Sequence, residues 1–202
     1  MIELLVGIPS VVYGIFGLFV LNDLFRDYIN PFMSSTLGFI PIFHYPNPST
    51  GIGILLASTV LAIMILPTIT SLSIEAINAV PQEYKEASVA IGATKWETTK
   101  KMVIPVASSG ILTAVVLGVM RAMGETMAIV MLMGNTLHIP GSIMDTGYAM
   151  TSKILNDITF YVAYDEPRSA LFGIAAILIL SEVLIVWVAH FIGRKGLGGR
   201  VK

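Results

Sequence analysis

Two oppositely charged side chains stand in the middle of a long apolar stretch of the sequence. Arg121 and Glu125 occur in GILTAVVLGVMRAMGETMAIVMLMG, whose other residues are apolar, small or hydroxylated. A charged side chain at the centre of a membrane helix costs about 2.5–3.5 kcal/mol on insertion scales, so it is expected to face protein or water rather than lipid. At a spacing of four residues, both side chains lie on one face of a helix and can pair.

This pair has two interpretations. One is an ion pair that only fixes the packing of helices. The other is an anion pathway, in which the Arg121 guanidinium donates a bidentate fork to a phosphate-like oxyanion. Glu125 then weakens the attraction, so that the anion is not trapped, and it can accept a hydrogen bond from a protonated oxygen. Transport requires binding that is strong enough for entry and weak enough for release.

A second feature lies in a charged stretch, where residues 81–105 read PQEYKEASVAIGATKWETTKKMVIP. Pro81 suits the first position of a helix, where its missing N–H is no loss. Gly92 can adopt the left-handed conformation that ends a helix. The sequence therefore predicts a short helix between these two residues. One face of this helix at helical spacing consists of Tyr84, Ala87, Ser88 and Ile91.

Another short helix is predicted next in the same stretch. Thr94 offers an N-cap and Glu97 stands three residues later, which is the pattern of a capping box. This helix is expected to run to about Val103, and Pro105 either disrupts it or begins the next segment. Two short helices joined at a glycine form a compact projection from the membrane. An amphipathic helix lying on the lipid surface is the alternative.

The spacing in this stretch resembles the cytoplasmic motif of ABC importer permeases, which reads EAA, three residues, Gly, nine residues and I-x-L-P. Glu86 and Ala87 begin the motif, Gly92 stands at its glycine, and Ile104 and Pro105 end it, with Ser, Met and Ile as departures in residue type. In that family the motif forms the coupling helix, which docks in a groove of the ATP-hydrolysing subunit. The resemblance implies that these residues lie at that contact.

Long apolar stretches dominate the rest of the chain. Of its 202 residues, 55% are hydrophobic and 12% are charged, about half the charge of a soluble domain; the mean hydropathy is +0.81. The apolar residues run continuously rather than alternating, which indicates helices that need about 20 residues each to cross a membrane. The sequence thus predicts an all-α, polytopic membrane helical bundle. Its four expected segments are Ile2–Leu21, Gly51–Leu72, Gly110–Met133 and Ala170–Ile192.

The polar stretches between these segments give an orientation. Residues 22–49 contain several prolines and are expected to form an irregular loop. The stretch 73–108 and the C-terminal tail carry four lysines or arginines each, whereas 22–49 and 134–168 carry three together. Cytoplasmic loops are rich in Lys and Arg. The 73–108 stretch, the C-terminus and the N-terminus are therefore expected on the cytoplasmic side of the cell membrane.

Three further stretches resemble the phosphate-specific permeases of this family: ELLVGIPSVVYG, GVMRAMGETMAIVMLMGN and IMDTGYAMTSKILND. PSVVYG and GETMA favour the PstC type over the PstA type. The resemblance implies the MetI-like fold of type I ABC importer permeases, with one permease domain over residues 1–202 and a coupling-helix loop at about 75–108. The chain begins at residues that follow two N-terminal spans in the family, so a truncated or reduced form of a six-span permease is expected.

The same resemblance implies the partners. A phosphate importer of this type contains a second, PstA-type permease, two ATP-binding subunits and an extracytoplasmic phosphate-binding protein. The chain has no Walker A motif, so ATP hydrolysis is expected in a partner, and neither enzyme activity nor a cofactor is expected. A net charge of −1 does not favour nucleic acid as a partner. No metal site is expected, because no carboxylates cluster at ligand spacing around His44, His138 and His190.

The first apolar segment holds two further candidates. Pro9 is expected to break its helix, and broken helices often line binding sites in transporters. Ser10 and Tyr13 are therefore candidates for the substrate pathway. A kinked or interfacial helix is the alternative.

Polar residues also occur after the third apolar segment. Asp145, Tyr148 and Thr151 are expected in an outer loop. There they either contact the binding protein or remain solvated.

Several functions remain as alternatives to a phosphate importer permease. A permease for another oxyanion, such as phosphonate or molybdate, belongs to the same class. A truncated, non-transporting membrane scaffold belongs to another, and it is distinguished by whether residues 81–105 recruit an ATPase and whether Arg121 affects uptake. An intramembrane enzyme needs a nucleophile beside a base, and Ser108 and Ser109 have no such partner in the sequence.

Overall fold

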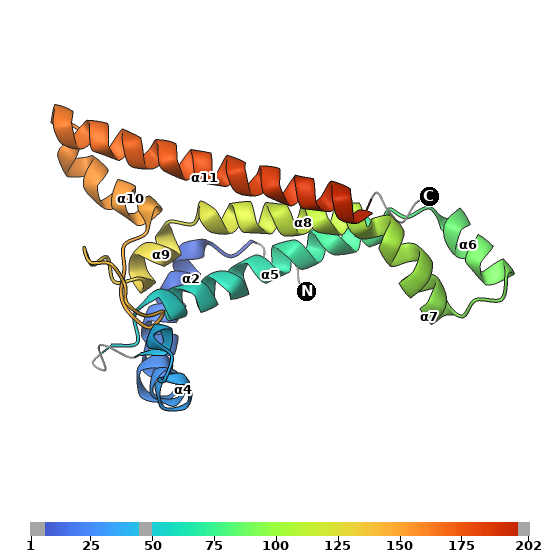
Figure 1. The fold of residues 1–202 in the computed structure, drawn as a ribbon, viewed down its shortest axis with the longest axis horizontal. Helices are drawn as coiled ribbons and strands as arrows, with labels where there is room; N and C mark the ends of the chain where they lie inside the picture. The colour runs from blue at the N-terminus through green and yellow to red at the C-terminus, as the bar shows by residue number, and fades with distance from the viewer. Residues whose placement is uncertain (1–6, 45–49, 198–202) are drawn as a thin grey trace. The chain divides into compact units, whose positions relative to one another are not determined.

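The computed structural model describes residues 7–44 and 50–197, and this part of the chain is helical without named β-strands. The predicted all-α fold is confirmed. Short π-helical turns occur at Gly17–Leu21, Phe25–Ile29 and Thr99–Val103, and a 3-10 turn occurs at Pro41–Phe43. The α-helices (Figure 1) are α2 (Ser10–Phe16), α3 (Asn22–Leu24), α4 (Asn30–Leu37), α5 (Ile54–Asn78), α6 (Gln82–Ala90), α7 (Lys95–Thr98), α8 (Ile104–Met123), α9 (Met127–Leu132), α10 (Met150–Tyr161) and α11 (Asp165–Leu197).

Three helical segments of the described chain are long and apolar enough to cross a membrane. They correspond to three of the four predicted segments, although the third ends at Met123 instead of continuing to Met133. Each has at least 25 residues, which is more than the roughly 20 that a bilayer requires. The three segments are Ile54–Asn78, Lys95–Met123 and Asp165–Ala189.

The fourth predicted segment, at the N-terminus, lies partly outside the described residues, which begin at Gly7. Pro9 stands immediately before α2 as its N-cap residue. The described helix therefore begins directly after Pro9, at a position where the missing N–H of proline is tolerated.

The prediction of an irregular loop over residues 22–49 is wrong for its first half. From α2 the chain stays helical through two π turns to Leu37, while residues 45–49 lie outside the described part. Phe25 and Asn30 are buried on this run and Tyr28 and Phe32 are exposed, which is the two-sided pattern of a helix packed on one face. Pro31 lies in the first turn of α4, where it is compatible with a helix.

The described chain forms two compact units. Within the described residues, the first consists of 65–121 and 182–197, and the second of 7–44, 50–64 and 122–181. In the second unit a buried apolar cluster joins the N-terminal helical run, the start of α5 and α9. Its members are Phe25, Leu56, Ala57, Val60, Ile129 and Leu132.

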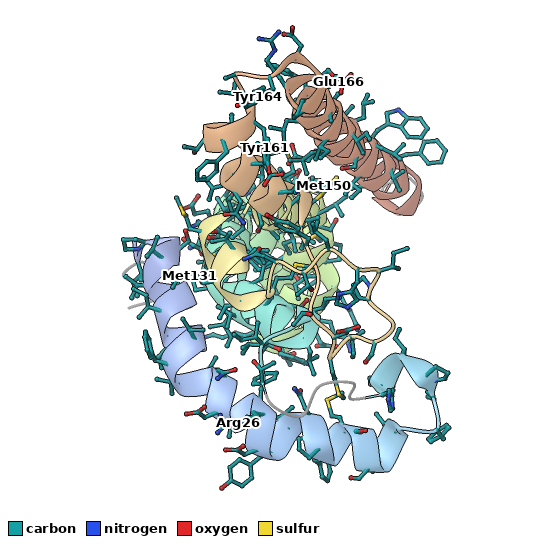
Figure 2. All side chains as sticks on the ribbon, turned by 90° about the vertical axis from the view of Figure 1, so that its left-hand side faces the viewer. Arg26, Met131, Met150, Tyr161, Tyr164 and Glu166 are labelled. Atoms are coloured by element: carbon teal, nitrogen blue, oxygen red, sulfur yellow. The ribbon has the colours of Figure 1, made fainter. Side chains whose placement is uncertain are left out.

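Glycines let α2 and the turn after it lie directly against α9. A Cβ atom on Gly14 would stand 2.8 Å from Sδ of Met131, and one on Gly17 would stand 2.8 Å from Cδ1 of Leu132. Figure 2 shows Met131 on α9 beside the N-terminal helical run. Because small residues allow helix backbones to approach closely, these two positions explain the contact.

The loop between α9 and α10 is ordered by its bonds to the start of α5. Backbone carbonyls of Leu132 and Ile143 accept hydrogen bonds from the N–H groups of Gly53 (3.0 Å) and Leu55 (2.7 Å). The carbonyl of Asp145 accepts one from Ile54 at 3.0 Å. The first N–H groups of a helix lack partners within the helix, so this loop satisfies the start of α5.

In the first unit, α5 and α8 approach closely at small residues. A Cβ atom on Gly118 would stand 2.4 Å from Cγ1 of Ile69, and one on Gly110 would stand 2.6 Å from the Cβ of Ala76. With the buried Ala114 between them, the glycines form a stripe of small residues at intervals of four along α8. Further along, Val80, Val103 and Ala107 form a small buried cluster.

This close contact leads to a prediction about stability. Gly118→Leu is expected to lower the free energy of unfolding by about 1–3 kcal/mol, because the new side chain overlaps Ile69. Gly173→Leu is the matched control, since a Cβ atom at that helical position meets nothing within 4 Å. Thermal unfolding of both variants in detergent measures the difference. Equal midpoints would show that the α5–α8 contact is not tight at Gly118.

Candidate functional site

The charged stretch after α5 folds as a helical hairpin, residues 81–103 (Figure 1). After α6, Gly92 has a φ of +88°, the left-handed conformation predicted for it. The Thr94 hydroxyl accepts a hydrogen bond from the Glu97 N–H at 3.2 Å, and the Glu97 carboxylate accepts one from the Thr94 N–H at 3.1 Å. The predicted capping box is thus confirmed, and α7 with its π turn reaches Val103 as predicted.

A polar pair joins the two arms of this hairpin. Ser88 on α6 and Thr98 on α7 are buried, and their hydroxyl oxygens lie 3.0 Å apart. Of the four residues on the predicted face of α6, only Ser88 is buried, and Tyr84, Ala87 and Ile91 are exposed. A hydroxyl pair therefore joins the two arms, apolar packing at the base involves Val103, and several other apolar side chains of the hairpin remain exposed.

Apolar side chains are unusually exposed on this hairpin. Ile91 is 85% exposed and Trp96 is 72% exposed. Glu86 and Ala87, at the start of the motif, are exposed on α6. A Cβ atom on Gly92 would meet nothing within 4 Å, so its backbone conformation alone requires glycine. Exposed apolar groups at the tip of a projecting element indicate a surface that contacts something else.

Ile104 and Pro105, at the end of the motif, lie in the first turn of α8. The N–H of Ile104 donates to the carbonyl of Thr99, five residues earlier, which closes the π turn. Because the Pro105 ring has no N–H and collides with the preceding turn of a regular helix, a wider turn before it keeps the helix continuous. Ile104 is exposed and Pro105 is half-buried.

Arg121 lies near the end of α8 and is bonded to the neighbouring helix. Its Nη1 donates a hydrogen bond to Oγ1 of Thr68 on α5 at 2.9 Å. The arginine is exposed and Thr68 is half-buried. One N–H of the guanidinium is thus engaged by a neutral hydroxyl, and an arginine has five such donors.

Glu125 does not continue the helix that carries Arg121, so the prediction that one helix presents both residues on one face is wrong. The helix α8 ends at Met123, and Gly124 is followed by a short non-helical step before α9. The Glu125 carboxylate accepts a hydrogen bond from the N–H of Ala128 at 3.2 Å. Gly124 favours the end of α8, and the carboxylate supplies an acceptor for the start of the next helix.

A cavity of about 180 Å³ lies beside Glu125 in the second unit. Its polar side chains include two hydroxyls, of Ser58 on α5 and of Thr151 on α10. Thr151 Oγ1 donates to the backbone carbonyl of Glu125 at 3.0 Å, which satisfies an acceptor freed by the helix break. The remaining lining residues are Ile54, Ala57, Ala122, Met123, Ile129, Met133 and Ala149. Glu125 is thus the acidic group of a small, mainly apolar cavity.

Ser10 and Tyr13 do not line that cavity. Ser10 is the first residue of α2 and is half-buried. Tyr13 packs against the apolar cluster around Leu132. The structure therefore places Tyr13 among core side chains of the second unit.

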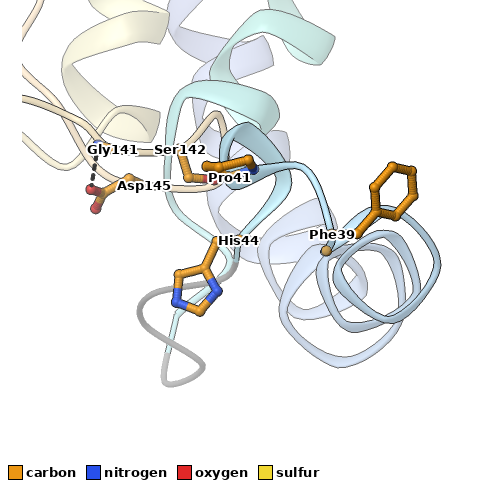
Figure 3. A pocket seen from close by; sticks show the side chains of 7 residues that line it. Phe39, Pro41, His44, Gly141, Ser142 and Asp145 are labelled. Atoms are coloured by element: carbon orange, nitrogen blue, oxygen red, sulfur yellow. Dashed lines mark hydrogen bonds between the residues drawn. The ribbon is translucent and has the colours of Figure 1, made fainter.

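A larger cavity, of about 330 Å³, lies between the turn after α4 and the loop before α10 (Figure 3). Two hydrogen bonds join these segments: the Ser142 hydroxyl and the Ile143 N–H both donate to the carbonyl of Ile42, at 2.9 and 3.0 Å. The lining residues are Gly38, Phe39, Pro41, His44, Gly141, Ser142 and Asp145.

Asp145 organises this loop. Its carboxylate accepts hydrogen bonds from the N–H groups of Gly141 (3.3 Å) and Thr146 (2.8 Å), and it lies 2.9 Å from Nε2 of His138. Burial raises the pKa of the Asp145 carboxyl, but the hydrogen bonds from His138, Gly141 and Thr146 outweigh it, so the pKa lies below the ordinary range. Among the residues that the structure describes, no three His, Asp or Glu side chains form a metal site.

The other two polar residues expected in this loop have different surroundings. The Tyr148 hydroxyl accepts a hydrogen bond from Nδ2 of Asn156 at 2.9 Å, and the Lys153 ammonium lies 5.1 Å from the centre of its ring. Thr151 lies in α10 and is bonded to Glu125 as described above. Asp145 and Tyr148 therefore belong to the loop, as predicted, whereas Thr151 belongs to the helix that follows it.

Sequence reasoning missed two hydroxyl residues at these sites and one carboxyl in the apolar helix α11. Thr68 and Ser58 carry no local signal, because a hydroxyl on an apolar helix is compatible with many positions. Glu182 is half-buried in α11, and its carboxyl within an apolar segment is a signal that the sequence does contain.

Comparisons with known proteins agree with this architecture. Residues 1–195 match the family model described as binding-protein-dependent transport system inner membrane component. The phosphate transport system permease protein PstC of Xylella fastidiosa is 39% identical over 191 residues, 94% of this chain and 58% of that protein. The PstC of Pasteurella multocida is 35% identical over 193 residues, 95% of this chain and 60% of that protein. The chain thus spans about three fifths of the length of these relatives.

A solved structure has the same fold. The MetNI methionine ABC transporter in an inward-facing conformation superposes with a TM-score of 0.57, covering 100% of this chain and 73% of that chain. Its sequence identity is 18%. This likeness supports the predicted MetI-like architecture.

The bonds of Asp145 lead to a prediction about pH. Asp145→Asn is expected to lower the free energy of unfolding at pH 7 by about 1–3 kcal/mol, because the N–H groups of Gly141 and Thr146 lose a charged acceptor. A carboxyl whose pKa is depressed by folding stabilises the protein above the unfolded value of about 3.9. This stabilisation is lost as the pH falls through the folded pKa. Thermal unfolding at pH 7 and pH 3 measures the effect.

The exposed Asp165, substituted by Asn, is the control for this measurement, since its side chain is 88% exposed. The difference between wild type and Asp145→Asn is expected to shrink at pH 3, while Asp165→Asn resembles wild type at both pH values. A difference that stays constant with pH would contradict the assigned bonds.

Proposed function

Because this chain belongs to the family of binding-protein-dependent transport system inner membrane components, we propose that it is a permease subunit of an ATP-driven importer of inorganic phosphate. Its apolar helices and its family make it an integral inner membrane protein. Two relatives of at least 35% identity are phosphate transport system permeases. This similarity favours phosphate over phosphonate or molybdate as the transported oxyanion.

The observation that carries the proposal is the exposed guanidinium of Arg121 in an apolar helix. Arginine remains charged and can bind an oxyanion through two parallel N–H groups. In this helix its partner is the neutral Thr68 hydroxyl at 2.9 Å, so the hydrogen bond does not neutralise the charge. A charged group on an apolar helix is expected to face protein or water rather than lipid. An anion pathway provides such surroundings.

Glu125 has a separate role in this proposal. It lies at the helix break beside the cavity of about 180 Å³, with hydroxyls of Ser58 and Thr151 in the same lining. A carboxylate repels an anion but can accept a hydrogen bond from a protonated phosphate oxygen. Glu125 therefore limits the residence of the anion along the pathway. Ser10 and Tyr13 contribute through the packing of α2.

The basic residues support an orientation for the chain. The stretch 73–108 and the C-terminal tail hold eight of the twelve lysines and arginines. The helical hairpin and the C-terminus lie in the cytoplasm in this proposal. The loop from Gly134 to Ala149 then lies on the outer side, where the binding protein delivers phosphate.

The helical hairpin, residues 81–103, is the site at which an ATP-hydrolysing subunit docks. Its exposed Glu86, Ala87, Ile91 and Trp96 supply a mixed charged and apolar surface, as protein interfaces commonly do. The complete importer contains a second permease, two ATP-binding subunits and a phosphate-binding protein. Both compact units of this chain belong to one permease domain in that assembly.

The first test concerns Arg121. In the assembled transporter reconstituted with its partner subunits, Arg121→Gln is expected to lower the initial rate of radioactive phosphate uptake about tenfold or more, because hydrogen bonds to charged groups contribute about 1.5–3 kcal/mol. Arg168→Gln is the matched control, since Arg168 lies outside the proposed pathway and pairs with the neighbouring Asp165. Unchanged uptake by the assembled Arg121→Gln transporter would show that Arg121 serves only in helix packing.

The second test concerns Gly92. Proline cannot adopt the φ of +88° seen there, so Gly92→Pro is expected to remove most of the ATP-hydrolysing subunit that co-purifies. Gly92→Asn is the control, because asparagine tolerates left-handed backbone. Quantified pull-down of the complex measures both. Full recovery of the ATP-hydrolysing subunit with Gly92→Pro would refute docking through the hairpin.

A further inference from the structure

The hydrogen bond between Arg121 and Thr68 joins residues 53 positions apart in the sequence. It connects α8 to α5 within the first unit. The contact is possible because Gly118, one helical turn before Arg121, lets α8 approach Ile69, the residue after Thr68. The packing of the two helices therefore brings a short hydroxyl side chain within reach of the guanidinium.

Thr68 differs from two other threonines on the same helix. The hydroxyls of Thr59 and Thr70 each donate to the carbonyl four residues earlier, at 2.8 Å. The Thr68 hydroxyl instead accepts a hydrogen bond from Arg121, and no bond in which it donates is found within the described residues. A hydroxyl has one proton to donate, so Thr68 still has that proton for another acceptor.

We propose that Thr68 and Arg121 form one oxyanion-binding pair. In this pair Thr68 orients the guanidinium and donates a hydrogen bond from its own hydroxyl to the bound phosphate. This inference rests on the proposed function. The arginine supplies the positive charge and further N–H donors, and the threonine supplies a neutral donor beside it. Because Thr68 is neutral, it holds Arg121 in place without competing with the anion for its charge.

The pair also fits the requirements of transport. An arginine fixed by a carboxylate would already be neutralised, and an arginine without a partner would have to be ordered when the anion binds. A neutral acceptor orders the guanidinium in advance, which reduces the entropic cost of binding. A threonine that only holds two helices together would instead affect stability and leave the affinity for phosphate unchanged.

The test compares hydroxyl removal at two positions of α5. Thr68→Val keeps the shape of the side chain and removes both hydrogen-bonding roles, whereas Thr70→Val removes a hydroxyl that bonds only to its own helix. Uptake of inorganic phosphate is measured as a function of its concentration in the reconstituted transporter, together with the amount of assembled complex. Thr68→Val is expected to raise KM about tenfold. Thr70→Val is expected to change it less than about twofold.

A conservative variant and a double variant complete the test. Thr68→Ser retains the hydroxyl and is expected to restore KM to within about threefold of wild type. In the Arg121→Gln background, Thr68→Val is expected to cause less than a twofold further change, because the pair acts as one unit. If Thr68→Val does not assemble, Thr68→Ala removes the hydroxyl with a smaller side chain and takes its place.

The outcomes separate this inference from the function on which it rests. If Arg121→Gln lowers uptake but Thr68→Val leaves KM unchanged, the pair is refuted and the importer function stands. The pair is also refuted if Thr68→Val raises KM by the same factor in the Arg121→Gln background as in the wild-type transporter. If neither Arg121→Gln nor Thr68→Val alters uptake by a fully assembled transporter, the anion pathway itself is wrong.

Discussion

The close approach of α5 and α8 depends on the absence of side-chain atoms at Gly110 and Gly118. Between membrane helices, lipid tails compete with apolar side chains as partners, so association relies on tight packing of small residues and on hydrogen bonds. Near one end of this contact lies the bond from Arg121 to Thr68. Near the other lies the buried cluster around Val103, at the base of the helical hairpin. One packing interaction thus supports both the proposed anion site and the proposed docking element.

Three irregular stretches of the described backbone have hydrogen-bond partners or a wider turn that accommodates them. At the break after α8, the Glu125 carboxylate and the Thr151 hydroxyl take the place of helical partners. Before Pro105, a π turn accommodates a residue that has no backbone N–H to donate. At the start of α5, carbonyls of the Gly134–Ala149 loop and its neighbour Leu132 accept the first N–H groups. Polar backbone groups in an apolar environment require such partners, and for this reason the departures from regular helix are ordered features.

The two charged side chains of the proposed pathway have different hydrogen-bond partners. The guanidinium of Arg121 is held by a neutral hydroxyl, whereas the Glu125 carboxylate is engaged with the start of α9. Each charged group is therefore oriented by its own local partner. A neutral partner leaves the positive charge of Arg121 available to an anion, as the proposed function requires.

The sequence by itself determined the elements whose signals lie within one or two helical turns. The left-handed Gly92 and the capping box of Thr94 and Glu97 appear where their patterns predict them. Three apolar spans overlap their predicted segments, although one of them ends at Met123 instead of Met133. Only the tertiary structure decided that Thr68 meets Arg121, that residues 22–37 are helical and that Glu125 leaves the helix of Arg121. Caps and spans depend on neighbours along the chain, whereas these features depend on partners from other helices. A contact between residues 53 positions apart in the sequence produces no recognisable local pattern.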